Sequence, residues 1–512
     1  MEKQGKLELT WVGKYDKEKL EPRILIEDSN RSYGNPQNEN LLIHGDNLLA
    51  LKAIQNDYAG KIKCIYIDPP YNTGNAFEHY DDGVEHSIWL SMIRSRLEIL
   101  WNLLDEETGS IWISIDDDEM PYLRVVLDEI CGRSCFIASN VWQKRYSREN
   151  REAIGDVHEY IIVYAKNPVK FKANRNKIPV SLEEMKAYKN PNNDPKGPWR
   201  PVPMTAQAGH ATKDQFYEIV TPTGAVYTPP EGRCWSLSKA TYERLLSEGR
   251  IYFGKNGDSQ PNTIRYFSEV EGVVPWTWWP STEVGHTDEA KKEIYALFGK
   301  DNAFDTPKPE RLIERVLHIA TNPGDIVLDA FIGTGTTCAV AHKMNRRWIG
   351  IEMGNQCYDF CEKRMRLVID GEQGGISKEV KWNGGGGYKF YELAEPLLVK
   401  NPVLPIYQIN PTYTWNMVCE AICKIEGFTY DPSGEFQGYS SENRFIHITE
   451  EFVNSKYVMS VMKNLGDNQS LIIYCKKNQA DMNLPENVEV KKIPKALLEK
   501  CNFDYKKEEA AE

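Results

Sequence analysis

The sequence predicts an α/β fold: a doubly wound, mostly parallel, Rossmann-like sheet. One indication is the apolar run Cys64–Ile67, which is typical of a strand buried on both faces. Another is the strand, glycine turn and helix start of residues 325–343, followed by a second strand that ends in Glu352. Parallel sheets hold ligands at the carboxyl ends of their strands, so the residues after each strand are the candidate site.

Four residues suited to amine chemistry, Asp68, Pro69, Pro70 and Tyr71, follow the first strand directly. The lone pair of an exocyclic amine is delocalised into its ring, which makes the nitrogen a poor nucleophile. The Asp68 carboxylate and the rigidly held Pro70 carbonyl can accept from the two N–H groups of such an amine. Tyr71 offers a face on which a nucleobase can stack. Taken alone, the motif is equally explained as a rigid turn.

A glycine turn follows the strand-like residues 326–328, and its candidate cofactor-binding residues are Asp329, Phe331, Gly333, Thr334, Gly335 and Thr336. The turn lacks the third glycine of the dinucleotide fingerprint and the Gly-Lys-Thr of a phosphate-binding loop. A nucleoside without pyrophosphate, such as S-adenosylmethionine, therefore fits better than NAD. Glu352 is placed to hydrogen-bond the ribose hydroxyls.

Together these two segments resemble the β group of DNA adenine-N6 methyltransferases, in which the catalytic motif precedes the cofactor motif. The sequence is most similar to the modification (Mod) subunits of type III restriction–modification systems, roughly from residue 7 to residue 397. The resemblance implies methyl transfer from S-adenosylmethionine to a base flipped out of double-stranded DNA, without a metal. It also implies a homodimer and a restriction (nuclease/helicase) subunit as partners.

Two alternatives stay open at this point. An N4-cytosine methyltransferase would present the same amine geometry, although such enzymes more often have Ser in place of Asp68. A non-catalytic, DNA-binding specificity subunit with a vestigial fold belongs to a different class. The intact motif beside an intact glycine turn argues against that second alternative.

Two more cofactor residues follow from the resemblance. Asp46 would lie near the adenine of the cofactor, although a helix cap explains this residue nearly as well. Lys308, in the segment 306–309, would point at the cofactor pocket, or else this turn only starts the helix over residues 310–320.

The acidic run 116–119 lacks any other metal-ligand pattern, and we expect it to cap a helix over residues 120–130.

The formal charge of −12 argues against a protein that coats itself in nucleic acid, but local fields decide DNA affinity. Residues 141–200 hold thirteen Lys and Arg against seven Asp and Glu, a surplus of six positive charges. The loop of a predicted hairpin over residues 136–166 carries four candidate phosphate contacts: Lys144, Arg145, Arg148 and Arg151. A solvated charged loop is an equally good interpretation.

The length of 512 residues predicts more than one domain. We expect an N-terminal extension (1–38), a catalytic half (39–166), an irregular target-recognition region (167–282), a cofactor-binding half (283–393) and a small α/β interaction domain (394–512). Scattered cysteines and the absence of a signal peptide or long apolar run predict a cytoplasmic protein.

Overall fold

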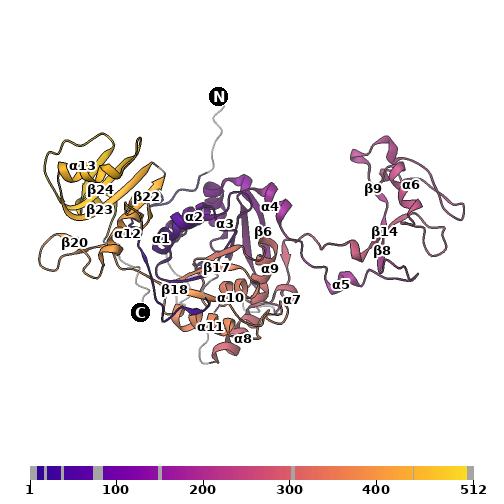
Figure 1. The fold of residues 1–512 in the computed structure, drawn as a ribbon. Helices are drawn as coiled ribbons and strands as arrows, with labels where there is room; N and C mark the ends of the chain where they lie inside the picture. Colours follow the sequence, from indigo (N-terminus) through magenta and orange to yellow (C-terminus); the bar gives the residue numbers. More distant parts are fainter. Residues whose placement is uncertain are drawn as a thin grey trace. The chain divides into compact units, whose positions relative to one another are not determined.

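A computed structural model describes residues 8–16, 20–35, 40–72, 85–147, 153–300, 306–441 and 443–503. The chain forms two compact units (Figure 1). One contains Met1–Asn176 and Trp276–Glu512, and the other is Lys177–Pro275. None of the described helices is long and apolar enough to span a bilayer.

An eleven-stranded sheet organises the first unit. Six neighbouring strands are parallel, from β18 to β5, whereas β1, β2 and β7 run antiparallel to the strand beside them. The strand order is β1 (Leu25–Glu27), β18 (Gly387–Leu393), β3 (Leu41–His44), β17 (Arg347–Glu352), β16 (Ile326–Asp329), β4 (Cys64–Ile67), β5 (Ser110–Ile115), β7 (His158–Ala165), β6 (Phe136–Gln143) and β15 (Trp278–Trp279), with β2 (Tyr33–Gly34) beside β18. The predicted mostly parallel sheet is confirmed.

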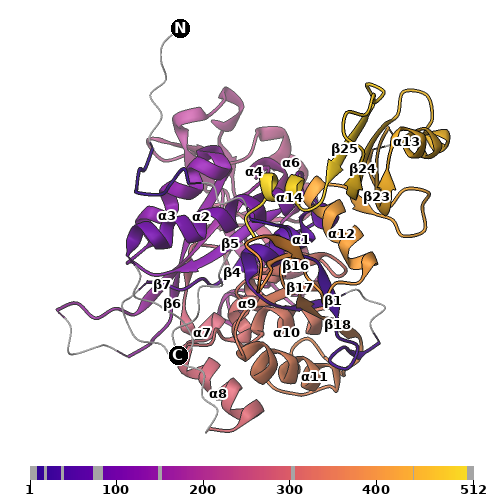
Figure 2. The ribbon, with the colours of Figure 1, turned by 90° about the vertical axis from the view of Figure 1, so that its left-hand side faces the viewer.

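Helices cover both faces of this sheet (Figures 1 and 2). On one face lie α1 (Asn47–Tyr58), α2 (His86–Leu103) and α3 (Met120–Leu127); on the other lie α9 (Glu310–Ala320), α10 (Thr336–Lys343) and α11 (Lys363–Ile369). The periodic apolar residues of α2, including Leu90, Ile93 and Leu97, are buried in the main core, as their spacing predicts. Shorter helices in this unit are α4 (Pro168–Asn174), α7 (Ser281–Val284) and α8 (Thr287–Phe298).

The acidic run before α3 does not act as we expected. Glu119 is the N-cap residue by position, but its side chain makes no capping hydrogen bond. Its buried carboxylate instead accepts from the Asn72 amide and pairs with His86, each at 2.7 Å. The expected cap is therefore wrong at Glu119, because this carboxylate is turned inward to a residue directly after the Asp68–Tyr71 motif.

The second unit has two small apolar cores, one of which contains Met204, Trp235 and Phe253. Its elements are α5 (Leu182–Met185), β8 (Trp199–Pro203), β9 (Thr205–Gln207), β10 (Ile219–Val220), β11 (Val226–Tyr227), β12 (Arg233–Trp235), α6 (Lys239–Ser247), β13 (Ile251–Tyr252) and β14 (Asn262–Tyr266). These short strands form sheets of two or three strands, which explains why no long periodicity is visible in this part of the sequence.

The C-terminal part of the chain forms a separate five-stranded sheet, coloured orange to yellow in Figure 1. Its strands are β21 (Thr429–Tyr430), β22 (Gly438–Ser441), β23 (Arg444–Val453), β24 (Ser470–Asn478) and β25 (Val488–Lys492). Around it lie the hairpin β19 (Leu398–Lys400) and β20 (Tyr407–Ile409), and the helices α12 (Trp415–Glu426), α13 (Ser455–Val461) and α14 (Lys495–Lys500).

Candidate active site

The carboxyl ends of β4 and β16 meet at one edge of the large sheet. The two strands pair in parallel with Leu328 opposite Ile65, so Asp68 and Asp329 emerge at the same edge. On one side of this pair the sheet continues through β17, and on the other through β5. In doubly wound folds such a switch point is where ligands bind. The structure thus brings together the two segments that the sequence singles out.

Asp68 is held by an ion pair with Lys308. The Lys308 Nζ lies 2.8 Å from Oδ1 and 2.7 Å from Oδ2 of Asp68. Burial raises the pKa of Asp68; the ammonium opposes this shift, and the charge of Glu159 adds to it. The resemblance places Lys308 at the cofactor pocket; in the structure, its Nζ contacts the Asp68 carboxylate and lies near Glu159. A buried ammonium needs a counterion, and Asp68 supplies it.

The Pro70 carbonyl accepts a hydrogen bond from the indole Nε1 of Trp89, at 2.7 Å. Trp89 lies in α2 and is fully buried, so packing fixes this donor. Because a carbonyl oxygen has two lone pairs, one stays available for a substrate amine. Sequence reasoning missed Trp89, since an apolar side chain in an amphipathic helix is indistinguishable from ordinary core.

The Tyr71 hydroxyl lies between two carboxylates. It is 2.8 Å from Oδ1 of Asp68 and 3.0 Å from Oε2 of Glu159, a buried residue of β7. The Lys308 Nζ lies 3.6 Å from the same Glu159 oxygen and 5.0 Å from the centre of the Tyr71 ring. Burial and the two negative charges raise the pKa of Tyr71 well above its ordinary value, so the phenol stays protonated. Stacking of its ring on a base stays a prediction.

The glycine turn after β16 has a left-handed backbone at Gly333 (φ +52°) and Gly335 (φ +78°). The Gly333 N–H donates to Oε2 of Glu352 at 2.8 Å, and Gln356 donates to the other carboxylate oxygen at 3.1 Å. Glu352 therefore fixes the turn itself. Contact of Glu352 with ribose hydroxyls stays a prediction.

Asp329 begins the turn as a buried carboxylate. One oxygen accepts from the Phe331 N–H at 2.9 Å and the other from the Thr337 hydroxyl at 2.6 Å. Burial raises the pKa of Asp329 to about 7, and the charges of Asp68 and Glu352 add to the shift. A carboxylate bonded to these two neutral donors would be stabilised by a cationic ligand, so the residues present fit S-adenosylmethionine, which carries a sulfonium and an ammonium.

The other predicted cofactor residues have structural partners. Asp46 caps α1, because its Oδ1 accepts from the Leu49 N–H at 2.9 Å, which confirms the helix-cap interpretation. Its other oxygen lies 3.6 Å from Arg96. Thr334 and Thr336 are buried with their hydroxyl oxygens 3.3 Å apart. Contact of Asp46 with a cofactor adenine stays a prediction.

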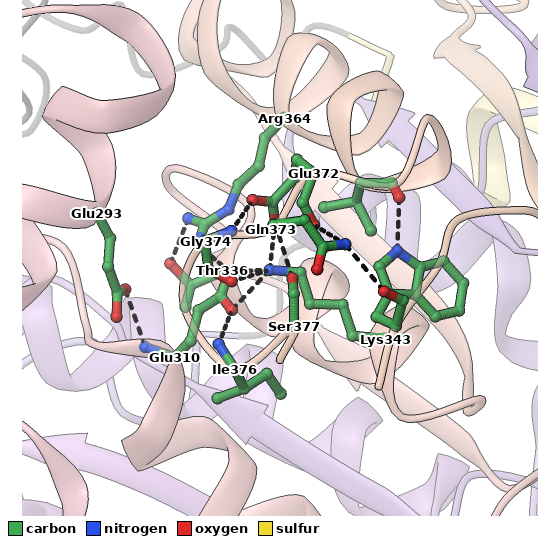
Figure 3. A network of polar contacts seen from close by, with 12 residues as sticks. Glu293, Glu310, Thr336, Lys343, Arg364, Glu372, Gln373, Gly374, Ile376 and Ser377 are labelled. Atoms are coloured by element: carbon green, nitrogen blue, oxygen red, sulfur yellow. Dashed lines mark hydrogen bonds and ion pairs between the residues drawn. The ribbon is translucent and has the colours of Figure 1, made fainter. Parts of the chain in front are cut away.

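A buried ionic network contacts the glycine turn through Thr336 (Figure 3). Arg364 donates to the Thr336 hydroxyl and to Glu310, each at 2.8 Å. Lys343, at the end of α10, places its Nζ 3.0 and 2.8 Å from the two oxygens of Glu310. Glu310 is the first residue of α9 and follows Lys308 by two positions. The network therefore links the turn to the segment that holds Asp68.

Residues 62–363 match the family described as DNA methylase, a range that includes both β4 and the glycine turn. The chain belongs to the DNA methylase family.

Several curated relatives of this DNA methylase carry the names of modification subunits. The type III StyLTI Mod subunit of Salmonella typhimurium is 35% identical over 342 residues, which are 61% of this chain and 51% of the relative. The probable type III HindVI Mod subunit of Haemophilus influenzae is 31% identical over 430 residues, 72% of this chain and 55% of the relative. The chain thus spans about half the length of these curated relatives.

Among solved structures, the M1.HpyAVI–SAM complex aligns with 64% of this chain and 99% of its own chain. Its TM-score of 0.31 and identity of 16% are too low to bear on the site of this DNA methylase.

The basic loop of this DNA methylase lies between β6 and β7, the antiparallel hairpin that the sequence predicts. Lys144 is mostly buried there, with its Nζ 2.7 Å from Asp156 and 3.5 Å from Glu159. Lys144 is thus already paired with these acids, and its contact with a phosphate stays a prediction. Arg145 is exposed and stays a predicted phosphate contact. Arg148 and Arg151 lie outside the described residues.

Proposed function

We propose that this DNA methylase transfers the methyl group of S-adenosylmethionine to N6 of an adenine flipped out of double-stranded DNA. The observation that carries the proposal is the adjacency of β4, followed by Asp68, and β16, followed by the glycine turn. One edge of the sheet then offers acceptors for an amine and, beside them, a buried carboxylate and a glycine turn suited to a cationic nucleoside.

In this proposal Asp68 and Pro70 act on the target amine. Asp68 accepts from one N–H and the Pro70 carbonyl from the other, which localises the lone pair on nitrogen and makes it nucleophilic. Trp89 holds the Pro70 carbonyl in place, and Tyr71 supplies the face for the flipped base. S-Adenosylmethionine, when bound, supplies an electrophilic methyl group, so no covalent enzyme intermediate is needed.

The cofactor would be held along the glycine turn. Asp329 is the anionic group for its positive charge, and Glu352 is the acceptor for ribose hydroxyls. Gly333 and Gly335 let the backbone approach the nucleoside, since glycine adopts a left-handed conformation without the strain that a side chain would bring. Phe331, Thr334 and Thr336 complete this predicted set.

We assign the chain to the modification half of a type III restriction–modification system, because the relatives above carry Mod-subunit names. A restriction subunit and a second copy of this chain are the proposed partners. The second unit, Lys177–Pro275, is the proposed target-recognition region. The exposed Arg145 side chain, two residues after the end of β6, is the proposed phosphate contact nearest in sequence to the site.

Transfer of tritium-labelled methyl groups tests the proposal. The full chain is incubated with labelled cofactor and duplex DNA, and the DNA is then digested to nucleosides. We expect label in N6-methyl-2′-deoxyadenosine from the wild-type chain and none from Asp68→Ala. Label in N4-methyl-2′-deoxycytidine would overturn the adenine assignment. DNA binding without any transfer would indicate the non-catalytic specificity subunit.

A further inference from the structure

The two hydrogen bonds at the Tyr71 hydroxyl need more than one proton. A hydroxyl has a single hydrogen, so it donates to one carboxylate at a time. Here its oxygen lies within hydrogen-bond distance of Asp68 on one side and Glu159 on the other. Both contacts are hydrogen bonds only when one carboxyl group is protonated and donates to the Tyr71 oxygen. The three groups therefore form a chain along which a proton can move between Asp68 and Glu159.

The charges around this chain favour one direction of transfer. Lys308 contacts both oxygens of Asp68 at 2.7 and 2.8 Å but lies 3.6 Å from Glu159. Glu159 lies near two ammonium groups, Lys144 at 3.5 Å and Lys308 at 3.6 Å, both farther away than Lys308 is from Asp68. A proton on Asp68 therefore disrupts two short contacts with Lys308, and its transfer to Glu159 restores them. Tyr71 itself stays protonated, so it passes protons on and does not store charge.

We propose that Glu159 receives, through the Tyr71 hydroxyl, the proton that Asp68 takes from the methylated amine. The inference rests on the proposed function. As the N–CH3 bond forms and the S–CH3 bond breaks, N6 becomes positively charged; its N–H bond then breaks and an O–H bond forms on Asp68. Asp68 next gives this proton to the Tyr71 oxygen while the original Tyr71 proton passes to Glu159. Solvent finally removes the proton from Glu159.

This route restores Asp68 for the next turnover. A protonated Asp68 would donate through one oxygen, accept fewer hydrogen bonds, and have no negative charge for the amine or for Lys308. Glu159 is thus a second acid of the site that acts through Tyr71, without touching the substrate. In the sequence, Glu159 is one residue of the predicted hairpin over residues 136–166, where nothing marks it as different from other polar residues.

The test compares Glu159→Gln, Tyr71→Phe and the double variant in steady-state methyl transfer. Glutamine keeps the size of Glu159 but takes up no proton, and phenylalanine keeps the ring of Tyr71 without its hydroxyl. We expect each single variant to lower kcat by about tenfold or more, the usual range for a lost proton-transfer step, with cofactor and DNA affinities unchanged. Glu159→Asp should recover part of the loss.

The double variant decides between one shared route and two separate roles. Both single changes interrupt the same chain, so the double variant should be no slower than the slower single variant. Tyr164→Phe is the matched control, because Tyr164 lies on the same strand and its hydroxyl donates to Asp128, away from this site. It should leave kcat unchanged.

Three results would overturn the relay: losses that multiply in the double variant, wild-type kcat in Tyr71→Phe, or a Glu159→Gln loss that lies wholly in KM. Tyr71→Phe removes only one oxygen, so it keeps the test valid even if Glu159→Gln does not fold. A wild-type chain that methylates no DNA would instead contradict the proposed function. The two failures are therefore distinguishable.

Discussion

Two ion clusters lie at the two motifs of the molecule, and they differ in how deeply they are buried. Behind the glycine turn, Glu310, Lys343 and Arg364 are almost completely buried, and Glu310 also accepts from the Ile376 N–H at 3.1 Å. At the end of β4, Asp68 is 23% exposed, and Lys308 lies near two acids at unequal distances.

The difference indicates two uses of the same chemistry. An almost completely buried cluster fixes backbone positions, since breaking a buried ion pair leaves an uncompensated charge. A partly exposed cluster with a spare acid can exchange partners when a substrate amine arrives. We infer that the Glu310 cluster supports the cofactor turn, whereas the Asp68 cluster takes part in the reaction.

The largest expected effect on methyl transfer comes from a change in the Asp68 cluster. Asp68→Ala should remove methyl transfer, because the amine loses its acceptor, while cofactor affinity stays within about tenfold, or roughly 1.4 kcal/mol. Calorimetric titration of cofactor into the variant measures the affinity. A greater loss of binding would mean that Asp68 belongs to the cofactor site.

Changes in the glycine turn, which the Glu310 cluster supports, should affect cofactor binding. Gly333→Val should abolish cofactor binding, since φ +52° disfavours a branched residue and its side chain would stand where the nucleoside approaches. Gly324→Val is the matched control, because Gly324 also has a left-handed backbone (φ +89°) but faces open space. Glu352→Ala should weaken binding by about 1–3 kcal/mol. Normal binding in both Gly333→Val and Glu352→Ala would show that the turn is only structural.

The pKa of Asp329 predicts a pH dependence of cofactor binding. As pH rises through about 7, Asp329 loses its proton and attracts the cationic cofactor, so affinity should rise several-fold between pH 6 and 8. Asp329→Asn should remove this dependence. Folding stability should respond with the opposite sign. The folded state holds the Asp329 proton more tightly than the unfolded chain does. The free energy of unfolding should therefore fall as pH rises from about 4 to about 7. A flat binding profile in the wild type would contradict the role of Asp329.

The smallest effect concerns the basic loop. Arg145→Glu should weaken DNA binding irrespective of sequence and lower the slope of log affinity against log salt by about 0.9 for each phosphate that is no longer neutralised. Lys144→Glu should instead reduce methyl transfer, because Lys144 is paired with Asp156 and lies close to Glu159. Affinity measured at several salt concentrations with specific and random duplexes separates the two. An unchanged slope in Arg145→Glu would place the phosphate-binding residues elsewhere.

Much of the fold could be predicted because local signals and tertiary structure agree. The apolar run Cys64–Ile67 is β4, and the helix expected over residues 310–320 is α9. The meeting of Asp68 with the glycine turn could also be anticipated, because parallel strands place their carboxyl ends at one edge.

The contacts among side chains could not be predicted from the same patterns. Trp89 looks like core, and Glu159 looks like any polar strand residue, yet both bond to the Asp68–Tyr71 motif across the fold. In the sequence, Lys308 and Lys144 look like ligand-binding cations. In the structure each forms an ion pair with a carboxylate, because a buried ammonium needs a counterion. Glu119 looks like a helix cap, although its side chain turns inward. Such pairings depend on three-dimensional neighbours that spacing along the chain does not encode.

One pair of matched variants tests the contrast between the two clusters most directly: Lys308→Met and Lys343→Met. Each replaces a buried lysine by an uncharged side chain of similar length. Unfolding free energy, cofactor affinity and methyl-transfer rate are measured for both. For Lys343→Met we predict a loss of about 3–5 kcal/mol in stability, with weakened cofactor binding. For Lys308→Met we predict a much smaller loss of stability, because Asp68 is partly exposed, and a severe loss of transfer. Equal destabilisation by the two variants, or full transfer activity in Lys308→Met, would contradict the division of roles between the clusters.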